Sequence, residues 1–185
     1  MNADAAYWTV SDINAVPRMT GAASVLDASD MADVCGRLAL WLPLIDVLDV
    51  GCGTGRLAKL CDGYLGVDIA PSAVAYCQRE GLNAALITGP EDLPPGRRGL
   101  IACLSVFTHI DRAARRAYLA AFAQRSWWLL VDVIHGAEGG TVQLWQADRD
   151  WFLADLASAG YDVVASTGGV GISDRHTYYS ARARE

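Results

Sequence analysis

The chain has 185 residues, 52% of them hydrophobic, which suits one domain with a complete apolar core and leaves no length for a separate substrate domain. Its formal net charge of −6 argues against binding to the phosphates of a nucleic acid, because that affinity depends on clustered lysine and arginine. No stretch approaches the roughly 20 apolar residues of a membrane span, and the first residues lack the basic start of a signal peptide. We therefore expect a cytoplasmic protein that does not bind a membrane.

The elements predicted from periodicity alternate between helices and strands over most of the chain. After an irregular opening, apolar residues at helical spacing predict a helix over residues 30–42, which Pro43 ends. Strands are expected at residues 45–50, 64–68, 84–88, 100–106 and 127–134, and helices at residues 54–61, 71–80, 112–124 and 148–159. Such alternation is typical of a parallel sheet with right-handed crossovers.

The end of the chain departs from this alternation. Residues 161–167 and 176–182 are short strand-like runs joined by a glycine-rich turn, so they are predicted to pair as an antiparallel hairpin. We thus expect a single domain over residues 1–185. In it, residues 1–44 form an N-terminal lid and helix, and residues 45–182 form an α/β core.

A glycine-rich turn follows the first predicted strand. Gly51, Gly53 and Gly55 let the backbone turn tightly and approach a ligand where a Cβ would clash. The first N–H groups of the helix that follows favour an anionic group at the same place. Asp68 ends the second strand, where a carboxylate can accept hydrogen bonds from both hydroxyls of a ribose. Together these residues predict a site for a nucleoside cofactor.

Two segments carry a more specific resemblance. VLDVGCGTG at residues 47–55 and GVDIAPSAV at residues 66–74 resemble the first two motifs of class I S-adenosylmethionine-dependent methyltransferases. The resemblance covers residues 45–182. It implies a Rossmann-like sheet of seven strands, mostly parallel, in the order 3-2-1-4-5-7-6 with strand 7 antiparallel and helices on both faces. It also implies S-adenosyl-L-methionine as the cofactor and S-adenosyl-L-homocysteine as the product.

Carried over position by position, the resemblance assigns the cofactor to the carboxyl ends of the first four strands. The first motif would surround the methionine and the ribose, Asp68 would bind the ribose, and Ile69 would pack on the adenine. The family usually has an acid where this chain has Gly89, so Glu91 or Asp92 either substitutes for it or is a solvated loop carboxylate. The implied cofactor-binding residues are Asp49, Gly51, Cys52, Gly53, Thr54, Gly55, Asp68, Ile69, Glu91, Asp92, Leu104 and Ser105.

The cofactor carries its own activated methyl group, so the protein has to place a nucleophile in line with it and exclude water. A general base helps if the acceptor is a hydroxyl or a protonated amine, and His109 and His135 follow the fourth and fifth strands. The alternative for each is a structural histidine, the role expected for His176. The loop at residues 136–141, with Trp145 beyond it, is expected to be a flexible segment facing the substrate.

Four aromatic or basic residues are candidate contacts for the acceptor. Tyr7, Trp8 and Arg18 could form a lid, with ordinary surface anchoring as the alternative, and Phe107 could line the pocket or belong to the core. The five cysteines are scattered without a CxxC pair, and no set of carboxylates suggests a metal site.

The sequence therefore predicts a metal-independent methyltransferase acting on an oxygen or nitrogen atom of a small molecule. Two alternatives remain open. The short chain and the missing acid at Gly89 make a catalytically silent module conceivable, one that binds the cofactor or a partner. An NAD(P)-dependent oxidoreductase is disfavoured, because the spacing is GxGxG rather than GxGxxG and an antiparallel hairpin closes the chain.

Overall fold

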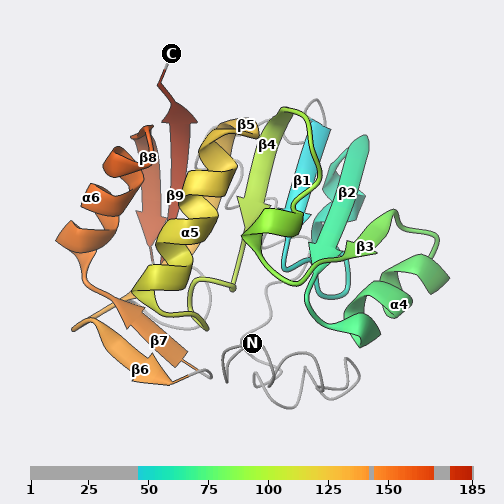
Figure 1. Ribbon diagram of the computed structural model, residues 1–185, viewed down its shortest axis with the longest axis horizontal. Helices are drawn as coiled ribbons and strands as arrows, with labels where there is room; N and C mark the ends of the chain where they lie inside the picture. Colours follow the sequence, from blue (N-terminus) through green and yellow to red (C-terminus); the bar gives the residue numbers. More distant parts are fainter. Residues whose placement is uncertain (1–45, 142–143, 169–175, 185) are drawn as a thin grey trace.

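The computed structural model describes residues 46–141, 144–168 and 176–184, and within them nine strands form one sheet (Figure 1). Its parallel part has the spatial order β3-β2-β1-β4-β5. These strands are β1 (Asp46–Val50), β2 (Gly63–Asp68), β3 (Ala84–Leu86), β4 (Arg98–Cys103) and β5 (Ser126–His135). Helical segments follow β1, β2 and β4, so the carboxyl ends of the parallel strands meet at one edge of the sheet.

Two antiparallel pairings complete the sheet beyond β5. Strand β9 (His176–Ala183) runs antiparallel to β5, and β8 (Tyr161–Gly168) runs antiparallel to β9. The arrow of β9 accordingly points opposite to that of β4 in Figure 1. The path β3-β2-β1-β4-β5-β9-β8 corresponds to the predicted order 3-2-1-4-5-7-6 with the seventh strand antiparallel. The predicted fold class and the closing hairpin are thereby confirmed.

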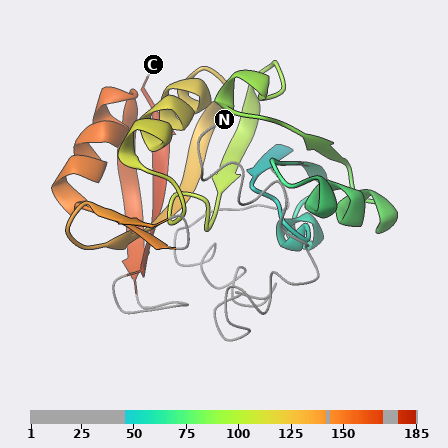
Figure 2. The ribbon, with the colours of Figure 1, turned by 60° about the horizontal axis from the view of Figure 1, so that its bottom comes forward.

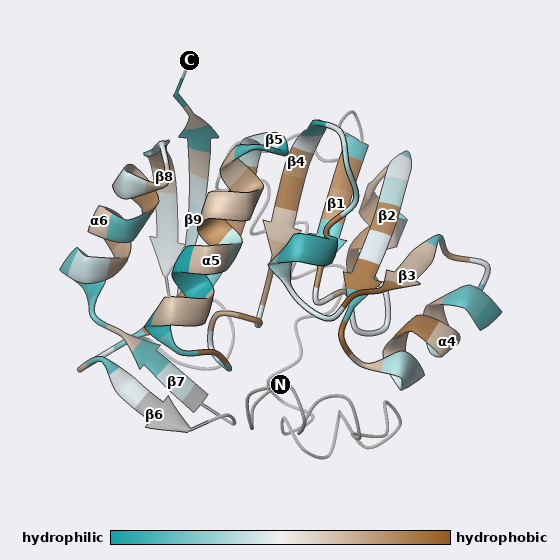
Figure 3. Ribbon diagram, in the orientation of Figure 1, coloured by the Kyte–Doolittle hydropathy of each residue, from teal (hydrophilic) through white to brown (hydrophobic). Residues whose placement is uncertain are grey.

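Helices cover both faces of the sheet (Figure 2). On one face, α5 (Arg112–Ala123) and α6 (Arg149–Ser158) pack on the larger apolar core, to which they contribute Leu119, Phe122 and Phe152. On the other face lie α4 (Pro71–Arg79) and the 3₁₀ helix η4 (Arg56–Leu60). Figure 3 shows the central strands β1 and β4 as mostly hydrophobic, as expected for strands that are buried on both sides.

Each of the two helices on the larger core begins at an aspartate. The Asp111 carboxylate accepts the Ala114 N–H of α5, and the Asp148 carboxylate accepts the Trp151 N–H of α6. These side chains satisfy backbone donors that have no partner inside the helix. No helix within the described ranges is both long and apolar enough to cross a membrane.

The structure differs from the prediction after β5. In place of a flexible loop over residues 136–141, β6 (Gly139–Thr141) and β7 (Leu144–Ala147) form an antiparallel hairpin. Ile134 pairs with β9 on one side and with β7 on the other, so the hairpin extends the sheet beyond the end of β4. Periodicity could not predict β6, because it has only three residues and two of them are glycines. The predicted lid and the helix over residues 30–42 lie outside the described residues.

Candidate functional site

The turn after β1 contains glycines whose surroundings differ. Gly51 has a φ of +74°, and a Cβ added there would lie 2.1 Å from Val106 Cγ2, so this glycine allows the turn to pack on the segment after β4. Gly53 has a φ of +54°, but a Cβ there would meet nothing within 4 Å. The backbone at Gly53 therefore adjoins open space, as a backbone that contacts a ligand must.

The remaining members of the turn face the protein. Gly55, with a φ of +72°, leads into η4, which is shorter than the helix predicted over residues 54–61. Cys52 is buried in a cluster with Val74 and Cys77 of α4. Thr54 is half-buried between the glycines. Contact between a ligand and this turn would therefore be made mainly by the backbone.

Asp68 connects the turn after β1 to the turn after β2. Its Oδ2 accepts the Gly53 N–H at 2.9 Å and its Oδ1 accepts the Ala70 N–H at 2.8 Å. Burial raises the pKa of this carboxyl, and the backbone N–H groups of Ala70, Gly53 and Ile69 oppose the shift. Each oxygen can accept a further hydrogen bond, so the carboxylate could bind hydroxyl groups while it stays tied to both turns. Ile69, the next residue, is half-buried against the larger core.

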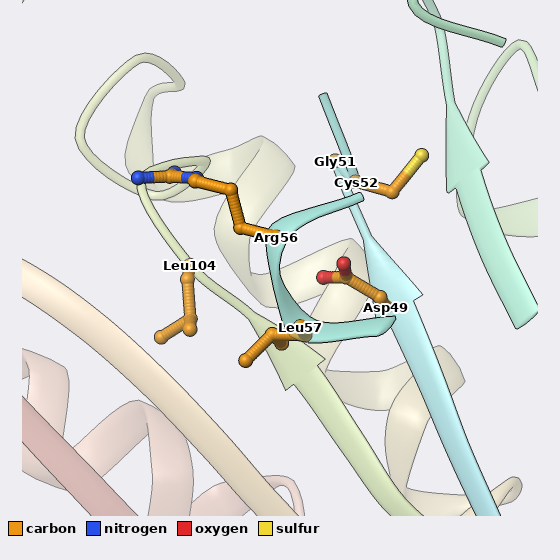
Figure 4. A pocket seen from close by; sticks show the side chains of 6 residues that line it. All are labelled: Asp49, Gly51, Cys52, Arg56, Leu57 and Leu104. Atoms are coloured by element: carbon orange, nitrogen blue, oxygen red, sulfur yellow. The ribbon is translucent and has the colours of Figure 1, made fainter. Parts of the chain in front are cut away.

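Asp49 lies beneath the glycine turn in a small pocket lined by Asp49, Gly51, Cys52, Arg56, Leu57 and Leu104 (Figure 4). The pocket has a volume of about 20 Å³, which is room for about one water molecule. The Tyr64 hydroxyl donates a hydrogen bond to Asp49 Oδ2 at 3.0 Å. Burial raises the pKa of Asp49 to about 7, against the smaller opposing effects of Tyr64 and Arg56. Asp49 therefore changes its charge near neutral pH.

The two acids after β3, Glu91 and Asp92, have different surroundings in the structure. Asp92 Oδ2 accepts hydrogen bonds from the backbone N–H (2.8 Å) and the hydroxyl (2.5 Å) of Thr88, so Asp92 closes a turn. Glu91 folds back instead, since a Cβ added to Gly89 would lie 2.6 Å from Glu91 Oε2. The Glu91 carboxylate thus fills the space in which a side chain at position 89 would begin. This geometry favours Glu91 over Asp92 as the substitute acid.

The segment after β4 contains a strained residue. Ser105 has a φ of +59° and is the one non-glycine residue with a positive φ in the described part of the chain. Its N–H donates to Asp132 Oδ1 of β5 at 2.6 Å, and its carbonyl accepts from Thr108 Oγ1 at 3.2 Å. Leu104, the residue before it, lines the Asp49 pocket. The structure therefore brings Leu104 and Ser105 next to the glycine turn.

The two candidate bases lie in different surroundings. His135 Nδ1 lies 3.1 Å from the Ala147 carbonyl, and Nε2 lies 2.6 Å from the Tyr179 hydroxyl, so both ring nitrogens are already hydrogen-bonded. Burial also lowers the pKa of His135. This geometry favours a structural role for His135. His109 is half-buried at the end of the turn that begins at Val106, to whose carbonyl its N–H donates at 2.9 Å.

The structure describes one of the four candidate contacts for the acceptor, Phe107. Phe107 is fully buried, stacked on Phe122 of α5 and edge-on to Phe152 of α6. Of the two roles open to Phe107, the structure therefore favours the core over the acceptor pocket, a choice that strand-end position alone could not make. Tyr7, Trp8 and Arg18 lie outside the described residues.

Glu138 anchors the β6–β7 hairpin, a role that the sequence pattern does not reveal. Its Oε1 pairs with the guanidinium of Arg115, which is only 2% exposed, and accepts the Trp145 indole N–H at 2.9 Å. Its Oε2 accepts the Asp148 N–H at 3.2 Å. The hairpin is also hydrogen-bonded to the segment after β4, since the backbone N–H of Trp145 donates to the Thr108 carbonyl at 2.6 Å. Residues predicted to form a flexible loop are thus part of a hairpin that hydrogen bonds hold next to the segment after β4.

Comparison with known proteins agrees with this geometry. Residues 47–125 match the model of a family described as methyltransferase domain. The magnesium protoporphyrin IX methyltransferase (ChlM) of Synechocystis PCC 6803, solved with bound SAH, has a TM-score of 0.72 and is 17% identical over 98% of this chain and 100% of that one. The glycopeptide N-methyltransferase MtfA, complexed with SAH, has a TM-score of 0.64 and is 15% identical over 87% of this chain and 92% of that one.

A third similar structure comes from a protein complex. It is a putative methyltransferase of Haloferax volcanii bound to the Trm112 methyltransferase activator, with a TM-score of 0.71 and 11% identity over 100% of this chain and 99% of that one. At these identities the likeness establishes the fold. The match of residues 47–125 and the fold shared with these structures support a class I S-adenosylmethionine-dependent methyltransferase.

Proposed function

We propose that the protein transfers the methyl group of S-adenosyl-L-methionine to an oxygen or nitrogen atom of a small molecule, without a metal ion. The observation that carries the proposal is the open space at Gly53 beside the Asp68 carboxylate. A glycine at which an added Cβ would meet nothing within 4 Å and a carboxylate with free acceptor capacity fit a nucleoside whose ribose lies on the turn. Two similar structures, of ChlM and MtfA, were solved with SAH bound.

The chain offers a group for each part of this cofactor. Asp68 would accept hydrogen bonds from the ribose hydroxyls, and the methionine end would lie over the Asp49 pocket, with the backbone of Leu104 and Ser105 beside its amino group. Glu91 would meet the adenine amino group. When bound, the cofactor supplies an electrophilic methyl group on a sulfonium. The remaining task of the chain is to align the acceptor and to exclude water.

A small-molecule acceptor follows from the charge of the chain and from its neighbours. A formal net charge of −6 disfavours a nucleic-acid substrate, which needs clustered cationic side chains. The names of two similar proteins specify a protoporphyrin and a glycopeptide as methyl acceptors. The β6–β7 hairpin, fixed by Glu138 next to residues 104–110, would form one wall of the acceptor site.

Calorimetric titration of the purified protein with SAH tests the proposal, with NAD titrated as the control. Micromolar binding of SAH alone supports the cofactor and leads to a screen of acceptors with S-adenosyl-L-methionine. Binding of NAD instead would support an oxidoreductase. Binding of SAH without methylation across a broad panel of hydroxyl and amine acceptors would support the catalytically silent alternative.

Once an acceptor is identified, replacing His109 by glutamine is expected to lower kcat while the dissociation constant for SAH stays unchanged. A general base acts on the acceptor proton and not on the cofactor, so only the chemical step should slow. Steady-state kinetics together with calorimetry separate the two effects. His135→Gln is the matched comparison, since both ring nitrogens of His135 are engaged within the protein. An unchanged kcat for His109→Gln would show that positioning alone carries the reaction.

Binding of SAH is expected to strengthen about tenfold as the pH rises from about 6 to about 8. The pKa of Asp49 is raised to about 7, so below this pH its carboxyl is neutral. Above it, the carboxylate attracts the ammonium group of the ligand. Calorimetry across this pH range measures the effect. Asp49→Asn should remove the rise, and Tyr64→Phe should move its midpoint upward, because the hydrogen bond from Tyr64 lowers the pKa. A rise that persists in Asp49→Asn would contradict the assignment.

Replacing Glu91 by glutamine is expected to weaken SAH binding by about three- to tenfold, because a charge-assisted hydrogen bond to the adenine amino group is lost. An analogue of SAH with oxygen in place of that amino group provides a sharper measurement. Wild-type protein should prefer SAH to the analogue, and the variant should lose much of the preference. Glu80→Gln, at an exposed position after α4, is the control. Equal discrimination by both variants would exclude Glu91 from the adenine site.

A further inference from the structure

A buried pair of side chains connects the closing hairpin to the segment after β4. Asp132 Oδ2 of β5 lies 2.6 Å from His176 Nε2 of β9, and neither side chain is more than 1% exposed. The other oxygen of Asp132 accepts the Ser105 N–H at 2.6 Å. The chain His176–Asp132–Ser105 thus runs from the last strand to the proposed cofactor site, and the function proposed above uses neither His176 nor Asp132.

Ser105 needs such a support because its backbone is strained. A residue with a Cβ at a φ of +59° is disfavoured and persists only where its surroundings hold it. Strand β4 ends at Cys103, so Ser105 lies beyond the pairing of β4 with β5. Its N–H is held by Asp132 and its carbonyl by Thr108. The orientation of the peptide between Leu104 and Ser105 therefore depends on Asp132.

Asp132 in turn needs His176. A fully buried carboxylate is stable only when its charge is paired and its oxygens are hydrogen-bonded. His176 pairs in register with Ile134, two residues along β5 from Asp132, so both side chains lie on the same face of the sheet. If the donor at His176 were removed, Asp132 Oδ2 would be left buried without its partner, and the carboxylate would turn toward another donor or leave its position. Such a movement would weaken the hydrogen bond from the Ser105 N–H to Asp132 Oδ1.

We propose that His176 is a positioning residue for cofactor binding. By donating to Asp132, it keeps the backbone of Leu104 and Ser105 in the orientation that the cofactor site requires. This inference rests on the proposed function, because that function assigns these two residues to the cofactor. It gives the closing hairpin a part in ligand binding although none of its described residues, 161–168 and 176–183, belongs to the proposed site.

Two substitutions of His176 and one control test the proposal. His176→Leu keeps an apolar volume but removes the donor, whereas His176→Gln keeps an amide N–H near the position of Nε2. Ser180→Ala is the matched control, since Ser180 lies on the same face of β9, is fully buried, and its Oγ has no hydrogen-bond partner within the described ranges. We expect His176→Leu to raise the dissociation constant for SAH about tenfold and His176→Gln to stay within about threefold of wild type. Ser180→Ala should leave it unchanged.

A second readout separates positioning from general stability. The Ser105 amide proton, in a short hydrogen bond to a carboxylate, should resonate downfield in the NMR spectrum of the ligand-free protein. We expect this resonance to move upfield in His176→Leu and to be restored in His176→Gln. A lowered Tm for His176→Leu with an unchanged dissociation constant and Ser105 resonance would overturn the proposal, and so would equal weakening in Ser180→Ala. If wild-type protein does not bind SAH, the proposed function fails, while the Ser105 resonance still reports whether His176 holds the turn.

Discussion

Replacing Asp68 by alanine is expected to weaken SAH binding by about 10- to 150-fold, which corresponds to about 1.5 to 3 kcal/mol. Two losses contribute to this effect. The ribose hydroxyls lose a buried acceptor, and the N–H groups of Gly53 and Ala70 lose the carboxylate that ties the two turns together. Isothermal titration calorimetry of the variant and the wild-type protein measures the change in the dissociation constant.

Two further variants show whether the effect is specific to Asp68. Asp68→Asn keeps the shape of the side chain and one carbonyl acceptor, so its affinity should lie between those of wild type and Asp68→Ala. Asp162→Ala removes an exposed carboxylate of β8, which pairs with Arg184 away from the glycine turn. This change should leave SAH binding unaltered. Wild-type affinity in Asp68→Ala would refute the cofactor assignment.

Replacing Gly53 by alanine is expected to weaken SAH binding about 100-fold while lowering the free energy of unfolding by only about 1 kcal/mol. In the free protein the new Cβ would have no neighbour within 4 Å, so the cost to stability comes from the φ of +54° alone. In the complex the same methyl group would stand where the ligand approaches the backbone. Calorimetry and urea unfolding measure the two quantities separately.

The chain offers a closely matched control in Gly81. This glycine follows α4, has a φ of +77°, and a Cβ added to it would also have no neighbour within 4 Å. Gly81→Ala should therefore lower the free energy of unfolding by a similar amount and leave SAH binding intact. If both alanine variants bind SAH like the wild type, the open space at Gly53 is not the cofactor site.

Most of the fold could be predicted because its signals are local. The apolar runs of β1, β2 and β4 and the periodic helices α5 and α6 appear in the sequence as short repeating patterns, and their alternation favours a parallel sheet. The β6–β7 hairpin could not be predicted in this way, because its anchor is the contact of Glu138 with Arg115, 23 residues away. Sequence periodicity carries no information about such a contact.

The site divides in the same way. The glycine turn and Asp68 belong to contiguous motifs in which the spacing of a few residues sets the geometry, so the amino-acid sequence alone is enough to recognise them. The conformation of Glu91 and the hydrogen bonds of His135 could not be predicted in that way. The Glu91 side chain turns back over Gly89, and both ring nitrogens of His135 form hydrogen bonds, one with the Ala147 carbonyl and one with the Tyr179 hydroxyl. These outcomes depend on rotamers and on neighbours from other strands.

The amino-acid sequence thus sufficed for the class of fold and for the glycine-rich motif that we propose binds the cofactor, while the order of the strands was implied by the resemblance to a known family. The first two follow from patterns a few residues long, because such patterns set the local backbone geometry wherever the segment lies in the fold. The support of Ser105 by Asp132 and His176 emerged from the folded arrangement alone. Asp132 and His176 are 44 residues apart and meet only through the register of β5 and β9, since a hydrogen bond requires two atoms within about 3 Å.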